Sequence, residues 1–296
     1  MQTSQLDLDR ADCILLAGVN LSENFPGIAR RIRRAREKGA KAGCILYDEG
    51  ITQHVTGSDN IKLLADLALL TGHIGSPGTG VNPLRGQISG EGSGDMGCVN
   101  VFYPGFKRVG PDTAKHFEQL WGVQDLPAKP GKTYMDIINT CKVVYAVGVN
   151  TMISAPDLGN VKKAFENMDF LVVQDIFMTE TAELADLVFP GAAWVEREGT
   201  HTGVDRRVIK VNKIVDPPGE AKPDWWIIAE PANKMGRARD FDYASAEEIF
   251  EEIRRCVPQY AGISYRRRES LCYDHGAGDI SLSHGKHNRQ SGQPDR

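Results

Sequence analysis

Residues 143–175 decide the fold: they read VVYAVGVN, then TMISAPDLGNVKKAFENMD, then FLVVQD. An apolar run that stops at Gly148, a polar turn, an amphipathic segment and a second apolar run predict one strand–helix–strand crossover in a parallel sheet. Ser154, followed by Pro156, is the expected N-cap of the helix. We therefore predict an α/β fold whose functional edge lies at the carboxyl ends of the strands.

The turn between the first strand and the helix has two interpretations. Gly148 and Asn150 stand just before a helix start, where free N–H groups and the helix dipole favour a bound phosphate. Alternatively, Gly148 only ends a buried strand and Asn150 only satisfies the turn. The turn alone does not decide between them.

A second copy of the pattern lies near the start of the chain. The run ILLAGVN ends at Asn20, and its Gly18 stands 130 positions before Gly148. A basic helical segment at 28–41 and an apolar run at 44–47 complete another crossover. The repetition predicts two pseudo-symmetric, Rossmann-like halves with parallel sheets, each offering a phosphate or nucleotide site. Internal repetition also arises from fold duplication alone.

Composition and charge limit the function. The chain has 41% hydrophobic residues and a net charge of −4, which is typical of a globular protein and favours no general role on nucleic acid or at a membrane surface. No apolar segment is long enough to span a bilayer, and the polar start MQTSQLDLDR is unlike a signal peptide. We expect a cytoplasmic location.

The six cysteines lie far apart, without a C-x-x-C pair. Iron–sulfur clusters and zinc sites need clustered thiolates, so we expect no iron–sulfur cluster within this chain. Cys13, Cys44 and Cys141 border predicted strands and are expected to be small core residues.

A glycine-rich stretch at 72–97 holds nine glycines. Such a loop either wraps closely around a ligand or is mobile, and we favour the ligand-wrapping loop. Arg85 is the one basic residue of the Lys or Arg type in this stretch. This side chain either pairs with an anionic substrate through its fork of donors or pairs on the surface with Glu91 or Asp95.

The remaining pattern continues the α/β alternation. Beyond the second crossover we expect a helix over 179–185 and a short strand closed by Pro190. The polar segment 196–207, which includes Thr200, fits either a solvated hairpin or a cofactor contact. The arginine-, glycine- and serine-rich segment 266–296 predicts a disordered tail.

Seven motifs between residues 11 and 265 resemble, in order, one known group. They are LLTGHIGSPGTGVNPLRGQ, DMG followed by YPGF, VGVN, FLVVQDIFMTETAELADLVFP, EREGTHTGVDRRV, PPGEAKPDWWII and YAGISY. The sequence is similar to the catalytic subunit of molybdenum or tungsten formate dehydrogenases, in the molybdopterin oxidoreductase (dimethyl sulfoxide reductase) family. The resemblance implies two nucleotide-binding halves that hold a bis(molybdopterin guanine dinucleotide) cofactor with Mo or W, and oxidation of formate to CO₂.

The resemblance also implies roles for individual residues. Arg85, in N-P-L-R-G-Q, is implied to orient formate beside the metal, and Gln87 to contact the pterin. Asp175 is implied to accept hydrogen bonds from a guanine or ribose. The other implied cofactor contacts lie in the two turns and in later motifs: Gly18, Asn20, Gly148, Asn150, Thr179, Glu180 and Thr200.

The sequence departs from the family pattern at both ends. Family members begin with a four-cysteine iron–sulfur motif and a cysteine or selenocysteine metal ligand, and nothing here matches those features. After Tyr265 the sequence shows no likeness to the family's C-terminal domain, which closes over the pterins. We expect a truncated first half with the glycine-rich cofactor loop at 1–110, a second half at 111–265 and the tail at 266–296.

Three functional hypotheses follow. The chain is a formate dehydrogenase component whose iron–sulfur and metal-ligand region comes from a separate chain, a non-catalytic module that binds the guanine dinucleotide cofactor, or a degenerate remnant. By likeness to the family we favour the first hypothesis, and we expect the isolated chain to be inactive in all three cases.

Overall fold

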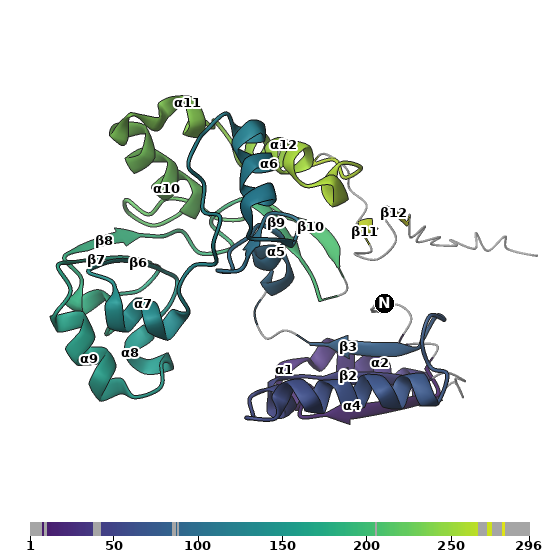
Figure 1. Cartoon of the computed structure of the whole chain (residues 1–296). Coiled ribbons are helices and arrows are strands. Elements are labelled where there is room, and N and C mark those ends of the chain that lie inside the picture. Colours follow the sequence, from purple (N-terminus) through teal and green to yellow (C-terminus); the bar gives the residue numbers. More distant parts are fainter. Residues whose placement is uncertain are drawn as a thin grey trace, which may run out of the picture. The chain divides into compact units, whose positions relative to one another are not determined.

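The computed structural model describes residues 8, 11–37, 43–84, 87, 89–204, 206–265, 271–273 and 280–281. These residues form two compact units, and Figure 1 labels many of their helices and strands. Unit 1 draws on 1–91, 202–209 and 262–296, and unit 2 on 92–201 and 210–261. The domain boundaries expected at 110 and 265 stay a prediction.

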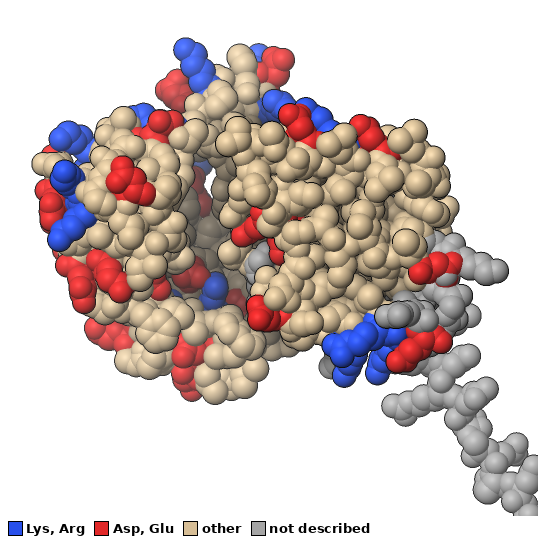
Figure 2. All heavy atoms as spheres, turned by 90° about the horizontal axis from the view of Figure 1, so that it is seen from below, with Lys and Arg blue, Asp and Glu red and all other residues tan. Residues whose placement is uncertain are grey.

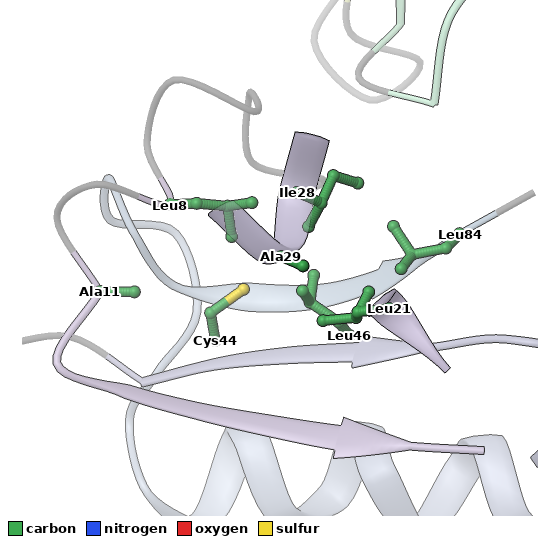
Figure 3. Close-up of a cluster of buried hydrophobic side chains, with 8 residues drawn as sticks. All are labelled: Leu8, Ala11, Leu21, Ile28, Ala29, Cys44, Leu46 and Leu84. Carbon is green, nitrogen blue, oxygen red and sulfur yellow. The ribbon is translucent and has the colours of Figure 1, made fainter. Parts of the chain in front are cut away.

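Unit 1 is built around a parallel sheet in the order β1-β2-β3. Two helical connections join the strands, with α2 and α4 on opposite faces of the sheet (Figures 1 and 3). The elements are β1 (Cys13–Ala17), α1 (Leu21–Asn24), α2 (Pro26–Glu37), β2 (Gly43–Tyr47), α3 (Glu49–Thr52), α4 (Gly57–Leu70) and β3 (Gly80–Pro83).

The core of unit 1 lies between the sheet and α1–α2 (Figure 3). Its buried members are Leu8, Ala11, Leu21, Ile28, Ala29, Cys44, Leu46 and Leu84. Cys44 behaves as the expected small core residue, and its Sγ accepts from Asn82 Nδ2 at 3.1 Å. Cys13, in contrast, is exposed because it opens an edge strand, so its predicted core role is wrong.

Unit 2 contains a second parallel sheet, in the order β6-β7-β8. Its elements are β6 (Val143–Val147), α8 (Thr151–Ser154), α9 (Leu158–Glu166), β7 (Phe170–Asp175), η2 (Ala182–Leu184) and β8 (Leu187–Pro190). The core packs α9 against the sheet through residues such as Val161, Phe165, Leu171 and Val173. Both parallel sheets confirm the predicted α/β class.

The two crossovers match element by element. Cys13–Ala17 and Val143–Val147 stand 130 positions apart, as do the short helices α1 and α8. The second helices differ, with 12 residues in α2 and 9 in α9. The duplication predicted from the GVN turns is therefore present in the backbone.

The helix start in the second crossover differs from the prediction. Ser154 ends α8, where its Oγ donates to Asn150 O at 2.9 Å, and it caps no helix. Asp157 is the N-cap of α9, and its side chain accepts from Asn160 N at 3.3 Å. The prediction of one helix starting at Ser154 was wrong because the chain forms a separate helical turn first.

Two further predictions need correction. The glycine-rich stretch 72–97 is only partly loop, because it contains β3 and α5 (Gly90–Asp95). Asp95 is 1% exposed, and its Oδ2 accepts from Tyr260 Oη at 2.8 Å, which anchors the C-terminal end of α5. The helix expected over 179–185 is only the 3₁₀ turn η2, and the backbone of Ala185 is already extended, which ends the turn. The Thr181 side chain before this turn bonds to Asn150 and to Met152 N.

The structure describes further helices and strands outside the two crossovers. They are β4 (Phe102–Tyr103), β5 (Lys107–Arg108), α6 (Pro111–Trp121), α7 (Tyr134–Thr140), β9 (Gly199–Thr202), β10 (Arg207–Val211), α10 (Asp224–Ala232), η3 (Asn233–Arg237), α11 (Ala238–Phe241), α12 (Ala246–Cys256), η4 (Pro258–Tyr260), β11 (Leu271–Tyr273) and β12 (Ile280–Ser281). The predicted tail at 266–296 lies outside the described residues, apart from β11 and β12. These two strands pair with each other, and β11 also pairs with β10.

Within the described part of the chain, every helix is too short or too polar to cross a bilayer. On the face shown in Figure 2, basic and acidic side chains lie interspersed. This distribution agrees with the small net charge of −4.

Candidate functional site

The carboxyl edge of the unit 2 sheet carries five of the predicted site residues. Gly148 and Asn150 follow β6, Asp175 ends β7, and Thr179 and Glu180 lie between β7 and β8. Parallel strands place their carboxyl ends along one edge, which is where ligands bind in open α/β sheets.

Asn150 joins the turn after β6 to the segment after β7. Its Nδ2 donates to Glu180 Oε2 at 2.7 Å, and its Oδ1 accepts from Thr181 Oγ1 at 2.8 Å. The Thr181 oxygen, which is fully buried, also accepts from Met152 N at 3.0 Å. Because both ends of the amide are bonded, the Asn150 side chain has one defined orientation.

The hydrogen bond from Asn150 changes the pKa of Glu180. The hydrogen bond from Asn150 favours the ionised carboxylate and lowers the pKa of Glu180 below its ordinary value. The predicted site therefore carries a negative charge at neutral pH next to the turn.

Gly148 gives the turn its shape. Its φ of 60° lies in the left-handed region, which favours glycine. Its N–H donates to Gln174 O at 2.8 Å, so this amide is engaged in the fold. A Cβ at this position would meet no atom within 4 Å. The space beside the turn is therefore open, whereas α8 spans only four residues and adds little dipole for phosphate binding.

Asp175 lies half-buried at the strand end. Its Oδ1 accepts from Ile176 N at 2.7 Å, and its backbone oxygen accepts from Gly191 N at 2.9 Å. The Thr179 hydroxyl accepts from Ala182 N at 3.3 Å, which stabilises the start of η2. An aspartate carboxylate has several lone pairs, so one backbone bond leaves acceptor capacity for a ligand.

Sequence reasoning missed a buried polar group behind this edge. Gln174 is 1% exposed, its Oε1 accepts from the Tyr145 hydroxyl, and its Nε2 donates to Asp224 Oδ1 at 2.7 Å. Burial and the nearby charge of Asp224 raise the pKa of Tyr145. The available signal was a glutamine inside the otherwise apolar strand FLVVQD.

The other predicted residues lie elsewhere. Gly18 and Asn20 follow β1 in unit 1, and Gln87 is an exposed residue of the same unit. Thr200 is half-buried in β9. Arg85 lies outside the described residues.

The described side chains offer few possibilities for holding a metal. Among them, no group of three or more His, Cys, Asp or Glu residues is arranged to bind a metal ion.

The repeated parallel crossovers, with glycine turns at the strand ends, define this chain as an α/β protein with an internally duplicated unit. The family model described as "Molybdopterin oxidoreductase" matches residues 37–234. The chain belongs to the molybdopterin oxidoreductase family.

Similar proteins include several formate dehydrogenase subunits. The "F420-dependent formate dehydrogenase 1 subunit alpha" of Methanococcus maripaludis is 44% identical over 238 residues, which cover 77% of this chain and 34% of the relative. The corresponding subunit alpha of Methanocaldococcus jannaschii is 47% identical over 232 residues, with the same coverage. "Formate dehydrogenase H" of Escherichia coli is 36% identical over 258 residues, covering 84% and 36%. The chain thus spans about a third of the length of these relatives.

A solved structure supports the fold. "Acetylene Hydratase from Pelobacter acetylenicus" matches with a TM-score of 0.55 and 16% identity, covering 90% of this chain and 53% of that one. At this identity the match supports the α/β architecture alone.

Proposed function

We propose that this chain binds molybdopterin guanine dinucleotide as a component of a formate dehydrogenase-type oxidoreductase. The observation that carries the proposal is the open turn at Gly148, which stands on the same sheet edge as Asp175. The identity of 44% and 47% to formate dehydrogenase alpha subunits supports the choice of reaction.

The residues of this edge fit a guanine nucleotide. The Asp175 carboxylate would accept hydrogen bonds from the ring N–H and amino groups of guanine, or from ribose hydroxyls. The left-handed glycine at 148 leaves space for the sugar or phosphate to approach the backbone. Thr179 and Thr200 supply hydroxyl groups from neighbouring motifs.

When bound, the pterin with Mo or W supplies the redox chemistry, and the protein supplies position and charge. Arg85, outside the described residues, would hold the formate carboxylate with its guanidinium donors. Gln87 would contact the pterin. Gly18 and Asn20 in unit 1 would serve the second nucleotide of the bis form.

We further propose that a separate chain carries the iron–sulfur and metal-ligand region. On this proposal the isolated chain is inactive. If it instead acts only as a holder of cofactor, the purified chain retains nucleotide without metal.

The direct test measures what the chain binds. We expect denaturation of purified chain to release pterin, seen by the fluorescence of its oxidised form, and guanosine monophosphate after hydrolysis. Molybdenum or tungsten is assayed in the same sample. Formate-dependent dye reduction by this chain alone would contradict the predicted inactivity, and absence of both nucleotide and pterin would argue for a remnant.

A binding measurement tests the site itself. GDP represents the nucleotide part of the cofactor. The wild-type chain should bind GDP in isothermal titration calorimetry. Asp175→Asn should weaken binding by about 1.5–3 kcal/mol, because an acceptor of charge-assisted hydrogen bonds is lost. Asp169→Asn, just before the opposite end of β7, is the matched control and should bind GDP normally. A wild-type chain that binds no GDP contradicts the proposal.

A further inference from the structure

Four side chains from different parts of unit 2 form one continuous polar network. The Tyr145 hydroxyl of β6 donates to Gln174 Oε1 of β7, and Gln174 Nε2 donates to Asp224 Oδ1 of α10 at 2.7 Å. Asp224 Oδ2 then pairs with Arg197 Nη1 at 2.6 Å. The network therefore runs from the sheet to the segment 196–198 before β9.

The members of this network have little freedom. Gln174 is 1% exposed and uses both its amide oxygen and its amide nitrogen, so its orientation is fixed. Both carboxylate oxygens of Asp224 have partners. The Arg197 side chain is 38% exposed and that of Asp224 33%, so the ion pair lies at the border between interior and solvent.

The network adjoins the predicted nucleotide contacts on two sides. Gln174 directly precedes Asp175, and Gly191 N donates to Asp175 O at 2.9 Å. A Cβ on Gly191 would lie 3.4 Å from Asp224 Oδ1, so Asp224 packs beside the same strand end. On the other side, Arg197 lies three residues before Thr200 in the motif E-R-E-G-T.

We propose that Asp224 is a positioning residue for nucleotide binding: through Gln174 and Arg197 it holds Asp175 and the segment leading to Thr200 in the arrangement that a guanine nucleotide requires. This inference rests on the proposed function, because it concerns the same ligand. Asp224 itself touches no nucleotide in this scheme. The competing explanation is that the ion pair between Arg197 and Asp224 only stabilises the fold.

The first test is Asp224→Asn in the full chain, with GDP as the probe. Asparagine keeps the volume and the oxygen that accepts from Gln174, but it removes the charge that holds Arg197. We expect GDP affinity to fall about tenfold, the lower end of the loss seen when residues that orient metal ligands are changed, while the urea midpoint of unfolding stays close to that of wild type. Lys142→Met, which removes the exposed 3.8 Å contact to Asp169 at the other sheet edge, is the matched control and should leave affinity unchanged.

The second test varies the other partner. Arg197→Lys retains a charge that can reach Asp224, whereas Arg197→Met does not, so lysine should restore most of the affinity lost with methionine. This pair also decides the question if Asp224→Asn unfolds.

The outcomes separate the two proposals. A wild-type chain that binds no GDP overturns both. Wild-type binding that is unchanged in Asp224→Asn or in Arg197→Met overturns the positioning role alone. Equal losses in Arg197→Lys and Arg197→Met, in step with lower urea midpoints, would mean that the ion pair only stabilises the fold.

Discussion

The two GVN turns have the same letters and nearly the same backbone, yet their surroundings differ. Gly18 has a φ of 62° and Gly148 a φ of 60°. A Cβ on Gly18 would lie 2.3 Å from Ile51 N, whereas a Cβ on Gly148 would meet no atom within 4 Å. The first turn packs directly against α3, and the second borders open space.

The difference comes from the chain that follows the second strand of each crossover. After β2 the chain turns at once into α3, and Gly50 N donates to Gly18 O at 3.0 Å. After β7 the chain instead leads to the T-E-T segment, which is residues 179–181. Its Glu180 and Thr181 side chains bond to the Asn150 side chain. Local sequence thus determines the shape of a turn, while distant sequence determines whether the space beside its glycine is filled.

The largest expected effect tests the packed turn. Gly18→Ala should destabilise the chain by about 3 kcal/mol or more, because the methyl group would overlap the backbone of Ile51 and the residue would keep a left-handed φ. Urea unfolding measures the free energy of unfolding of the wild type and the variant. Gly27→Ala in α2, where a Cβ meets no atom within 4 Å, is the control and should be neutral or slightly stabilising. A loss below about 1 kcal/mol for Gly18→Ala would show that the turn is not closely packed.

The next effect tests the bonded side chain of the open turn. Asn150→Ala should cost about 1–3 kcal/mol, because the buried Thr181 hydroxyl loses its acceptor and Glu180 loses its donor. The matched change in unit 1 is Asn20→Ala. Asn20 makes no side-chain capping bond to α1, so we expect a change within about 0.5 kcal/mol. Equal losses in the two variants, measured by urea unfolding, would remove the distinction between the turns.

A smaller effect on stability is expected for Gly148→Ala. The left-handed conformation alone costs a residue with a Cβ about 1–2 kcal/mol, and no clash adds to that strain. The added methyl group would, however, occupy the open space beside the turn. The loss in the free energy of GDP binding should therefore exceed the loss in the free energy of unfolding. If Gly148→Ala bound GDP as wild type does, the ligand would not approach this turn.

Sequence alone predicted what depends on local pattern and on repetition. The alternation of apolar runs and amphipathic segments indicated both crossovers, and the repeated GVN indicated their equivalence. The motifs also indicated the family, which the match over residues 37–234 confirms. The helix limits were less predictable, since Ser154 and Asp157 are both capable N-caps and only the local fold selects Asp157.

The polar network around Gln174 could not be predicted, because its contacts join residues far apart in the sequence. Gln174 and Asp224 stand 50 positions apart, and Arg197 lies between them in a polar segment that fits a solvated hairpin equally well. The close packing of Gly18 against α3 could not be predicted for the same reason. Nothing in ILLAGVN indicates that Ile51 lies against Gly18.

The smallest expected effect concerns the charge beside the open turn. Asn150 lowers the pKa of Glu180 below its ordinary value of 4.5, so Asn150→Ala should raise this pKa toward 4.5. Because the folded pKa lies below the unfolded one, the stabilisation is fully present above pH 4.5 and is lost as pH falls through the lowered folded value. Solvent exposure of Glu180 keeps the effect on stability small. Carbon-13 NMR titration of the Glu180 carboxyl group measures the shift, and Asn20→Ala should leave it unchanged. An identical Glu180 pKa in wild type and Asn150→Ala would show that the hydrogen bond between the turn after β6 and the T-E-T segment does not persist in solution, and the two turns would then differ only in their packing.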